Sequence, residues 1–285
     1  MALDTIRTVA VLGAGTMGNG IAHVFARSGY NVILRDVEPH FLDRAMAAVA
    51  KNLDREIKKG KIAEGDKAKI LGRIHATSEL AEIARADFAV EAVPELLDLK
   101  LSVLREADQL LRPEAILASN TSSISVTTLA AATGRPDRFI GMHFMNPVPV
   151  MELVEVIRAL QSSDQTFRTT MALCEKLGKK PVAVNDAPGF ISNRVLMPMI
   201  NEAAFAVMEG VATAEAVDAI MKLGMSHPMG PLELADFIGL DVCVNILDVL
   251  FTGFGDSKYR ACPLLRKMVA AGWLGRKSGR GFYGY

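Results

Sequence analysis

The sequence is poor in cysteine, in aromatic residues and in net charge. Its 285 residues include one tryptophan, and 32 basic side chains balance 32 acidic ones. The cysteines, Cys174, Cys243 and Cys262, are odd in number and form no C-x-x-C pair, so neither a disulfide framework nor a zinc site is indicated. With a formal net charge of zero, the sequence lacks the excess of basic residues that is typical of nucleic-acid-binding proteins.

Long apolar runs are missing as well. None reaches the roughly 18 residues of a membrane span, and the first residues, MALDTIRTVAVLG, pass into a predicted strand without a signal-peptide core. We therefore expect a cytoplasmic protein with buried thiols and without nucleic-acid, membrane or metal partners. Half of the residues are hydrophobic, which is enough for the cores of two ordinary domains.

What the sequence does contain is an alternation of short apolar runs with helical patterns. The alternation predicts an α/β, Rossmann-type domain over residues 1–186, with a mostly parallel sheet covered on both faces. An all-α domain is predicted for residues 187–285, and its first helix is expected to start at a capping Asp186, with Pro188 in the first turn, and to run to Gly210. The predicted strands are Thr8–Leu12, Asn31–Asp36, Asp87–Val93, Ala115–Ser119, Arg138–His143, Met151–Ile157 and Pro181–Val184.

A glycine motif, G-x-G-x-x-G, follows the first predicted strand. Gly13, Gly15 and Gly18 form it, and a helical pattern and a second strand come next. Such glycines permit a tight turn, let a pyrophosphate approach the backbone and let the helix pack on the strand. Asp36 ends the second strand, where a carboxylate accepts both ribose hydroxyls of NAD. The motif predicts an NAD site, with a turn that binds nothing as the alternative.

One histidine stands out because of its position. His143 ends a strand, and Glu155 lies twelve residues further on, in a run that is apolar on both faces. A buried carboxylate is costly unless it is paired. A histidine held by a carboxylate is a general base with a fixed tautomer. Spacing alone leaves a second pairing equally open, in which Glu155 binds Arg158 and His143 is passive.

Several motifs together resemble the 3-hydroxyacyl-CoA dehydrogenases, most of all the short-chain bacterial type. The resemblance covers the whole chain, and the motifs match in order and spacing. They are GAGTMGNGIA, ILASNTSS, GMHFMNPVPVMELVEVI, APGFISNR, HPMGPLELADFIGLD and GWLGRKSGRGFY.

The resemblance implies NAD-dependent interconversion of a short-chain 3-hydroxyacyl-CoA and its 3-oxoacyl-CoA. It implies that His143 is the general base, that Glu155 orients it, and that Ser122 and Asn193 contact the substrate and take part in catalysis. It also implies a homodimer formed through the C-terminal domain. The residues that it places around the cofactor are Gly13, Gly15, Thr16, Met17, Gly18, Asp36, Glu95, Lys100, Asn120 and Asn146.

A basic stretch, AKNLDREIKKGK at Ala50–Lys61, has two interpretations. At helical spacing its cations line one face, and composition alone favours a solvated surface. The resemblance instead implies contacts from Asn52, Arg55 and Lys59 to the nucleotide part of coenzyme A.

Two rival functions are disfavoured by the residues present. A 3-hydroxyisobutyrate-type dehydrogenase needs a catalytic lysine on the interdomain helix, where this chain has Asn193 in GFISNRVLMPM. The second rival is a non-enzymatic relative with the same fold. It is disfavoured because the sequence contains the complete set of Ser122, His143, Glu155 and Asn193. Acyl chain length, direction and pathway stay open.

Overall fold

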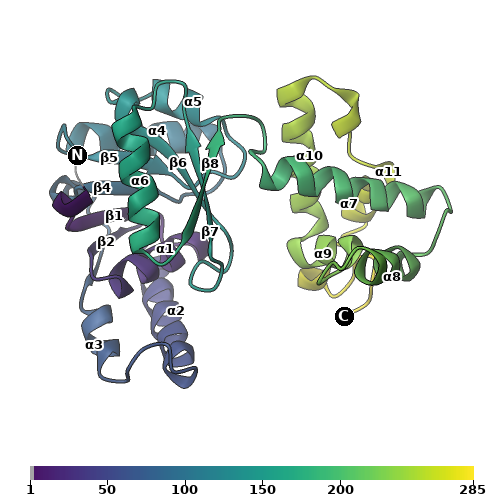
Figure 1. The fold of residues 1–285 in the computed structure, drawn as a ribbon, viewed down its shortest axis with the longest axis horizontal. Helices are drawn as coiled ribbons and strands as arrows, with labels where there is room; N and C mark the ends of the chain where they lie inside the picture. The colour runs from purple at the N-terminus through teal and green to yellow at the C-terminus, as the bar shows by residue number, and fades with distance from the viewer. Residues whose placement is uncertain (1–2) are drawn as a thin grey trace. The chain divides into compact units, whose positions relative to one another are not determined.

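The computed structural model describes residues 3–285, which form two compact units that meet in the sequence between Asp186 and Ala187. The prediction of a mostly parallel α/β sheet followed by a helical part is confirmed (Figure 1). No helix within the described residues is long and apolar enough to cross a membrane.

The first unit is built on one eight-stranded sheet in the order β3-β2-β1-β4-β5-β6-β7-β8. Neighbours from β3 to β6 pair in parallel, β6 and β7 pair antiparallel, and β7 and β8 pair in parallel. The sheet direction therefore reverses once, between β6 and β7. The strands are β1 (Thr8–Leu12), β2 (Asn31–Arg35), β3 (Ile74–Thr77), β4 (Phe88–Glu91), β5 (Ile116–Ser119), β6 (Phe139–Phe144), β7 (Leu153–Arg158) and β8 (Lys180–Asn185).

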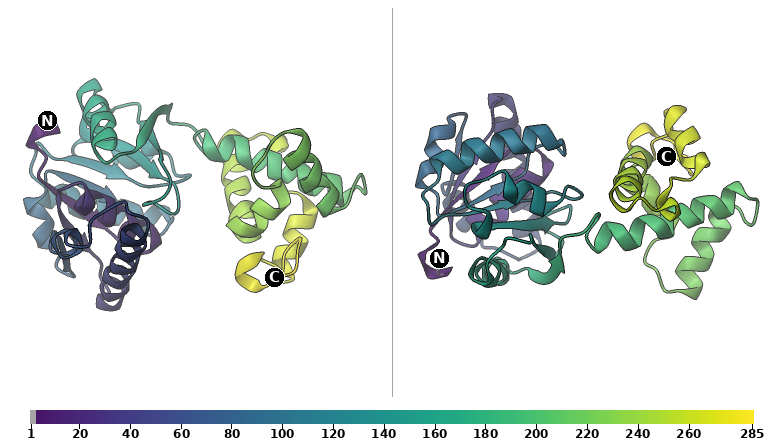
Figure 2. Two further views of the ribbon diagram at one scale, coloured as in Figure 1. Left: turned by 60° about the horizontal axis from the view of Figure 1, so that its bottom comes forward. Right: turned by 90° about the horizontal axis from the view of Figure 1, so that it is seen from above.

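Helices cover both faces of this sheet. In Figure 1, α6 lies in front of the sheet and α4 and α5 lie behind it, and α2 with α3 projects beyond the sheet. Figure 2 shows the same layers from two other sides. The central strands are buried on both faces, as expected for parallel strands between helices. The helices are α1 (Thr16–Arg27), α2 (Pro39–Lys58), α3 (Asp66–Leu71), α4 (Leu97–Leu110), α5 (Val126–Ala131) and α6 (Asp164–Lys176).

The second unit is a bundle of helices around its own core. Met197, Leu232, Leu247 and Leu265 are almost fully buried in it. Buried Asp236 holds the C-terminal segment by accepting hydrogen bonds from the backbone N–H groups of residues 282 and 283. The helices are α7 (Ser192–Met208), α8 (Ala214–Gly224), α9 (Pro231–Ile238), α10 (Leu240–Phe254) and α11 (Pro263–Ala270).

The predicted start of the first C-terminal helix was wrong. Helix α7 begins at Ser192, and Asp186 does not cap it. The Asp186 carboxylate instead accepts hydrogen bonds from the backbone N–H groups of Val126 and Thr127, at the start of α5. The N-cap residue of α5 is Ser125, and Asp186 satisfies two further N–H groups at the start of this helix, which lies 60 residues earlier in the chain.

Candidate active site

The polar ends of the parallel strands meet at one edge of the sheet. In the ladder, Leu12 of β1 is level with Arg35 of β2 and with Glu91 of β4, and Glu91 is level with Ser119 of β5. Because β6 runs parallel to β5, its end at His143 and Phe144 lies at the same edge. Ligands of open α/β sheets bind at this edge.

The three motif glycines differ in what surrounds them. A Cβ on Gly13, whose φ is +103°, would lie 2.7 Å from the Ala92 carbonyl oxygen. A Cβ on Gly18 would lie 1.8 Å from the Gly13 carbonyl oxygen. Gly15 has no atom within 4 Å of its Cβ position, and α1 begins at the next residue, Thr16. Two glycines thus serve the packing, while Gly15 opens the helix N-terminus to a ligand, as a dinucleotide pyrophosphate requires.

Asp36 is tied to this turn. One carboxylate oxygen accepts the Ala14 N–H at 2.7 Å, and the other accepts the Glu38 N–H at 3.2 Å. These bonds fix the carboxylate directly after β2, beside the glycine turn. Each oxygen keeps acceptor capacity for a ribose hydroxyl.

His143 and Glu155 face each other across the antiparallel pair β6–β7. Their Cα atoms are paired in the ladder, and His143 Nδ1 lies 2.8 Å from Glu155 Oε2. Both residues are buried, at 8% and 2% exposure. An ionised carboxylate only accepts hydrogen bonds, so the imidazole tautomer that fits this contact has its proton on Nδ1 and its lone pair on Nε2. Arg158 binds Asp164 at 2.7 Å and the Ser162 carbonyl, which decides between the two pairings that spacing left open.

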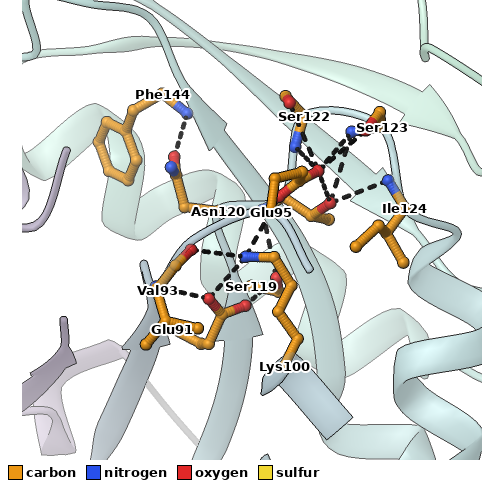
Figure 3. A network of polar contacts seen from close by, with 11 residues as sticks. Glu91, Val93, Glu95, Lys100, Ser119, Asn120, Ser122, Ser123, Ile124 and Phe144 are labelled. Carbon is orange, nitrogen blue, oxygen red and sulfur yellow. Dashed lines mark hydrogen bonds and ion pairs between the residues drawn. The ribbon is translucent and has the colours of Figure 1, made fainter. Parts of the chain in front are cut away.

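Glu95 organises the loop after β5 (Figure 3). One of its carboxylate oxygens accepts hydrogen bonds from the backbone N–H groups of Ser122 and Ser123, both at 2.9 Å, and from the Thr121 hydroxyl at 2.5 Å. Burial acts to raise the pKa of Glu95, but Lys100 and these donors outweigh it and hold the pKa below its usual value. Ser122 is therefore held by an ionised carboxylate.

Asn120 connects this loop to the strand that carries His143. Its side-chain oxygen accepts the Phe144 N–H at 2.9 Å, and its own N–H donates to the Glu91 carbonyl at 2.8 Å. Asn120 thus fixes the end of β6 relative to β4. Asn146, two residues beyond Phe144, is exposed and precedes a cis-proline, Pro147.

The segment between β6 and β7 is anchored from two sides. Lys179, which is 6% exposed, donates to the carbonyls of Val148 at 2.5 Å and Met151 at 2.7 Å. On the other side Val148 lies against Gly20 of α1, where a Cβ would approach to 2.8 Å. The predicted strand began at Met151, but β7 begins at Leu153. The hold of Lys179 on the Met151 carbonyl explains this difference.

The basic stretch lies at the C-terminal end of α2, with Arg55 and Lys59 exposed. Arg55 donates to Asn52 at 3.0 Å. The two acids of the stretch are paired elsewhere: Asp54 binds Lys67 of α3 at 2.5 Å, and Glu56 binds Arg27 of α1 at 2.6 Å.

Asn193 belongs to the second unit. It lies in the first turn of α7, is 8% exposed, and donates its backbone N–H to the Gly189 carbonyl at 3.2 Å. Its buried side chain comes directly after a turn in which Gly189 and Phe190 both have positive φ.

Two buried charges, Glu91 and Lys179, were not assigned to the site from the sequence. Buried Lys100 was assigned to it only through the family resemblance. The sequence gave a weak signal for Glu91 and for its partner Lys100, because an acid inside an apolar strand requires a partner when it is buried.

Comparison with known proteins identifies the class to which this fold and site belong. Residues 8–187 match the model of the 3-hydroxyacyl-CoA dehydrogenase NAD-binding domain, and residues 189–285 match that of the 3-hydroxyacyl-CoA dehydrogenase C-terminal domain. The chain belongs to the 3-hydroxyacyl-CoA dehydrogenase family.

Within the family, the chain is similar to proteins described as 3-hydroxybutyryl-CoA dehydrogenases. It is 58% identical over 275 residues to a probable 3-hydroxybutyryl-CoA dehydrogenase of Deinococcus radiodurans, covering 96% of this chain and 99% of that protein. It is 55% identical over 280 residues to the 3-hydroxybutyryl-CoA dehydrogenase of Bradyrhizobium diazoefficiens, covering 98% and 96%. The crystal structure of (S)-3-hydroxybutyryl-CoA dehydrogenase from Ralstonia eutropha superposes with a TM-score of 0.96 at 53% identity, over 99% of both chains.

Proposed function

We propose that this chain is an NAD-dependent oxidoreductase that interconverts (S)-3-hydroxybutyryl-CoA and acetoacetyl-CoA. The observation that carries the proposal is the buried His143–Glu155 pair, at the sheet edge where the glycine turn also lies. The similar proteins supply the substrate: their descriptions agree on 3-hydroxybutyryl-CoA.

The residues at the glycine turn fit a dinucleotide. Gly13 and Gly18 allow the close packing, and the backbone at Gly15, Thr16 and Met17 offers N–H groups to a pyrophosphate. Asp36 is expected to accept the ribose hydroxyls. When bound, NAD⁺ accepts the hydride that leaves C3 of the hydroxyacyl group. The remaining positions expected around it are Glu95, Lys100, Asn120 and Asn146.

His143 moves the proton in this reaction. Because Nδ1–H donates to Glu155, Nε2 is the atom that takes the proton from the 3-hydroxyl group. The imidazolium that forms is stabilised by the Glu155 carboxylate, which is buried and therefore only weakly screened. In the reverse direction, Nε2–H returns the proton to the 3-oxo group.

Ser122 and Asn193 hold the substrate in this proposal. Each offers a hydrogen bond to the reacting oxygen or to the thioester carbonyl, which fixes C3 for transfer. Ser122 comes from the loop that Glu95 holds, and Asn193 from the first turn of α7. Asn52, Arg55 and Lys59 are expected from the resemblance to contact the phosphates of coenzyme A. Asp54 and Glu56 bind Lys67 and Arg27, so these two acids do not neutralise Arg55 or Lys59.

The second unit is proposed to form a homodimer. Its helices expose large apolar side chains, among them Val195 at 66%, Leu223 at 86% and Phe237 at 57%. Burial of such side chains drives association. Light scattering tests this directly, and a monomer at micromolar concentration would contradict it.

A turnover assay with acetoacetyl-CoA and NADH tests the activity. Wild type should consume NADH, and His143→Gln should lower kcat by about 10²–10⁴-fold, with NADH affinity retained. His75→Gln is the matched control, because His75 is half-exposed on the edge strand β3 and binds Glu82. Near wild-type kcat in His143→Gln would refute the role of the base, and an inactive wild type would refute the substrate.

A further inference from the structure

The buried face of helix α2 is apolar until its last position. Its buried residues recur every three or four positions, as in a helix that packs on a core, and they are Leu42, Ala45, Val49, Leu53 and Glu56. Glu56 is 7% exposed. A buried carboxylate is costly unless it has partners, so the surroundings of Glu56 show what holds this end of the helix.

Both partners of Glu56 come from one side of α1. Arg27 Nη1 donates to Glu56 Oε1 at 2.6 Å, and His23 Nε2 lies 3.4 Å from Glu56 Oε2. His23 and Arg27 are four residues apart in α1 and therefore lie on the same side of it. Burial acts to raise the pKa of Glu56, but His23 and Arg27 outweigh it and hold the pKa below its usual value. Glu56 is therefore an anion that ties α2 to α1.

The backbone of Glu56 closes the end of α2. The Lys61 N–H donates to the Glu56 carbonyl at 2.9 Å, and the Gly60 N–H donates to the Ile57 carbonyl at 2.9 Å. Gly60 has a φ of +66°. These two hydrogen bonds and the left-handed glycine form a Schellman motif, which fixes how a helix ends. The residue that α1 holds is thus the one on which the last turn of α2 closes.

The same turn carries two of the residues expected to contact coenzyme A. Arg55 directly precedes Glu56, and Lys59 lies three residues after it, and both are exposed. The backbone N–H of Lys59 donates to the Arg55 carbonyl at 3.2 Å, so the two residues belong to one hydrogen-bonded turn. A displacement of Glu56 would therefore displace Arg55 and Lys59 with it. Because α1 begins at the glycine turn, α1 also fixes where these cations lie relative to the dinucleotide site.

We propose that Glu56 is a positioning residue that acts through Arg55 and Lys59 on the nucleotide part of coenzyme A, and that Arg27 and His23 hold Glu56 in place. The inference rests on the proposed function, because it requires that Arg55 and Lys59 contact this nucleotide. Glu56 itself contacts neither substrate nor cofactor in the proposal. Its removal should therefore change the affinity for coenzyme A and leave the chemical step intact.

The first experiment compares Glu56→Gln with Asp54→Asn. Each variant removes one negative charge from the basic stretch, but Asp54 is exposed and pairs with Lys67 of α3 rather than with α1. Glu56→Gln should raise KM for acetoacetyl-CoA by about 5–30-fold, the effect of losing an exposed charged contact, with kcat and the Kd for NADH unchanged. Asp54→Asn should not raise KM, because a more positive surface attracts phosphates. An unchanged or lower KM in Glu56→Gln, or an equal rise in both variants, would overturn the proposal.

Acetoacetyl-pantetheine, which lacks the nucleotide, separates positioning from general damage to the fold. Glu56→Gln should match wild type on this substrate. An equal loss of kcat/KM on both substrates, or weaker NADH binding, would show that Glu56 only supports the fold and would refute the proposal. If Glu56→Gln folds poorly, Arg27→Met removes the same ion pair from its less buried side. It should raise KM for acetoacetyl-CoA in the same way, and an unchanged KM would count against the proposal.

A combined variant tests whether Glu56 acts through the two cations. When Arg55 and Lys59 are both replaced by alanine, adding Glu56→Gln should raise KM no further, because residues that act as one unit are not additive. A further rise as large as that in the wild-type background would show that Glu56 acts elsewhere.

Calorimetry with free coenzyme A keeps the inference separate from the reaction. If wild type does not turn over acetoacetyl-CoA, the proposed function fails, and the Kd for coenzyme A still decides the role of Glu56. This Kd should be about 5–30-fold higher in Glu56→Gln than in wild type, and no higher in Asp54→Asn. An equal Kd in Glu56→Gln and wild type, or no binding of coenzyme A to wild type, would overturn the positioning role.

Discussion

The buried ammonium of Lys179 makes the stability of the first unit depend on pH. Burial is the largest cause that lowers the pKa of Lys179, and Arg27 and Lys61 lower it further, while Glu56 and Glu152 act in the opposite direction. The pKa falls from 10.5 to about 8. The unfolded chain therefore binds the proton more tightly than the folded protein does.

The sign of the effect follows from this difference. Below about pH 8 both states carry the proton, and the full cost of burying the charge is present. As the pH rises from about 8 to 10.5, the folded protein loses the proton first and the cost disappears. The neutral amine keeps two N–H donors, which is enough for the carbonyls of Val148 and Met151. One pKa unit corresponds to about 1.4 kcal/mol, so wild type should gain about 2 kcal/mol relative to Lys179→Met between about pH 7.5 and about pH 9.5.

Urea unfolding at the two pH values measures this gain. Circular dichroism follows the chain as a whole, and Trp273, the only tryptophan, reports the second unit by its fluorescence. The difference in unfolding free energy between wild type and Lys179→Met should grow with pH, and the Trp273 transition should show no such growth. A difference that stays constant or shrinks as the pH rises would refute the reasoning.

Three further predictions concern the proposed reaction. Glu155→Gln should lower kcat, and adding it to His143→Gln should cost little more, because the two residues act as a unit; fully additive losses in kcat would count against the pair. Asp36 should give NADH an advantage over NADPH of about 10–150-fold in kcat/KM, the value of one charged hydrogen bond, and equal values would disprove it. Arg55→Ala and Lys59→Ala should each raise KM for acetoacetyl-CoA by about 5–30-fold without changing kcat, since the contacts are exposed and screened by salt. The same variants should match wild type on acetoacetyl-pantetheine, which lacks the nucleotide; an equal loss on both substrates would mean that the basic face does not contact the nucleotide.

The elements that a sequence pattern predicts well here are those whose signals are local. The strand, glycine turn and helix at residues 8–27 depend on neighbouring residues, and the structure has them as predicted. Strand β3 was missed because it has four residues, two of them exposed, and so has no continuous apolar run. Its identity as a strand comes from pairing with β2, which is a long-range contact.

The charged residues that support the site were harder to predict for the same reason. Lys179 lies beside another lysine and resembles a solvated surface residue, and only the tertiary fold places its ammonium under two carbonyls. Asp186 carries the usual sequence signal of a helix cap, but that signal does not tell which helix start the acid binds. The His143–Glu155 pair was easier to predict from the sequence, because a buried acid close to a strand-end histidine has few possible partners.

The reversal of direction between β6 and β7 determines which changes in chain length this site tolerates. Successive side chains of a strand point to opposite faces, so deleting one residue inside β7 ahead of Glu155 would turn its carboxylate to the face away from His143. The segment between the two strands is not in this ladder, and a residue added there leaves the opposition of His143 and Glu155 unchanged. Variation in length among natural or engineered forms should therefore be confined to residues 145–152, where it would alter the surroundings of the base without separating it from its acid.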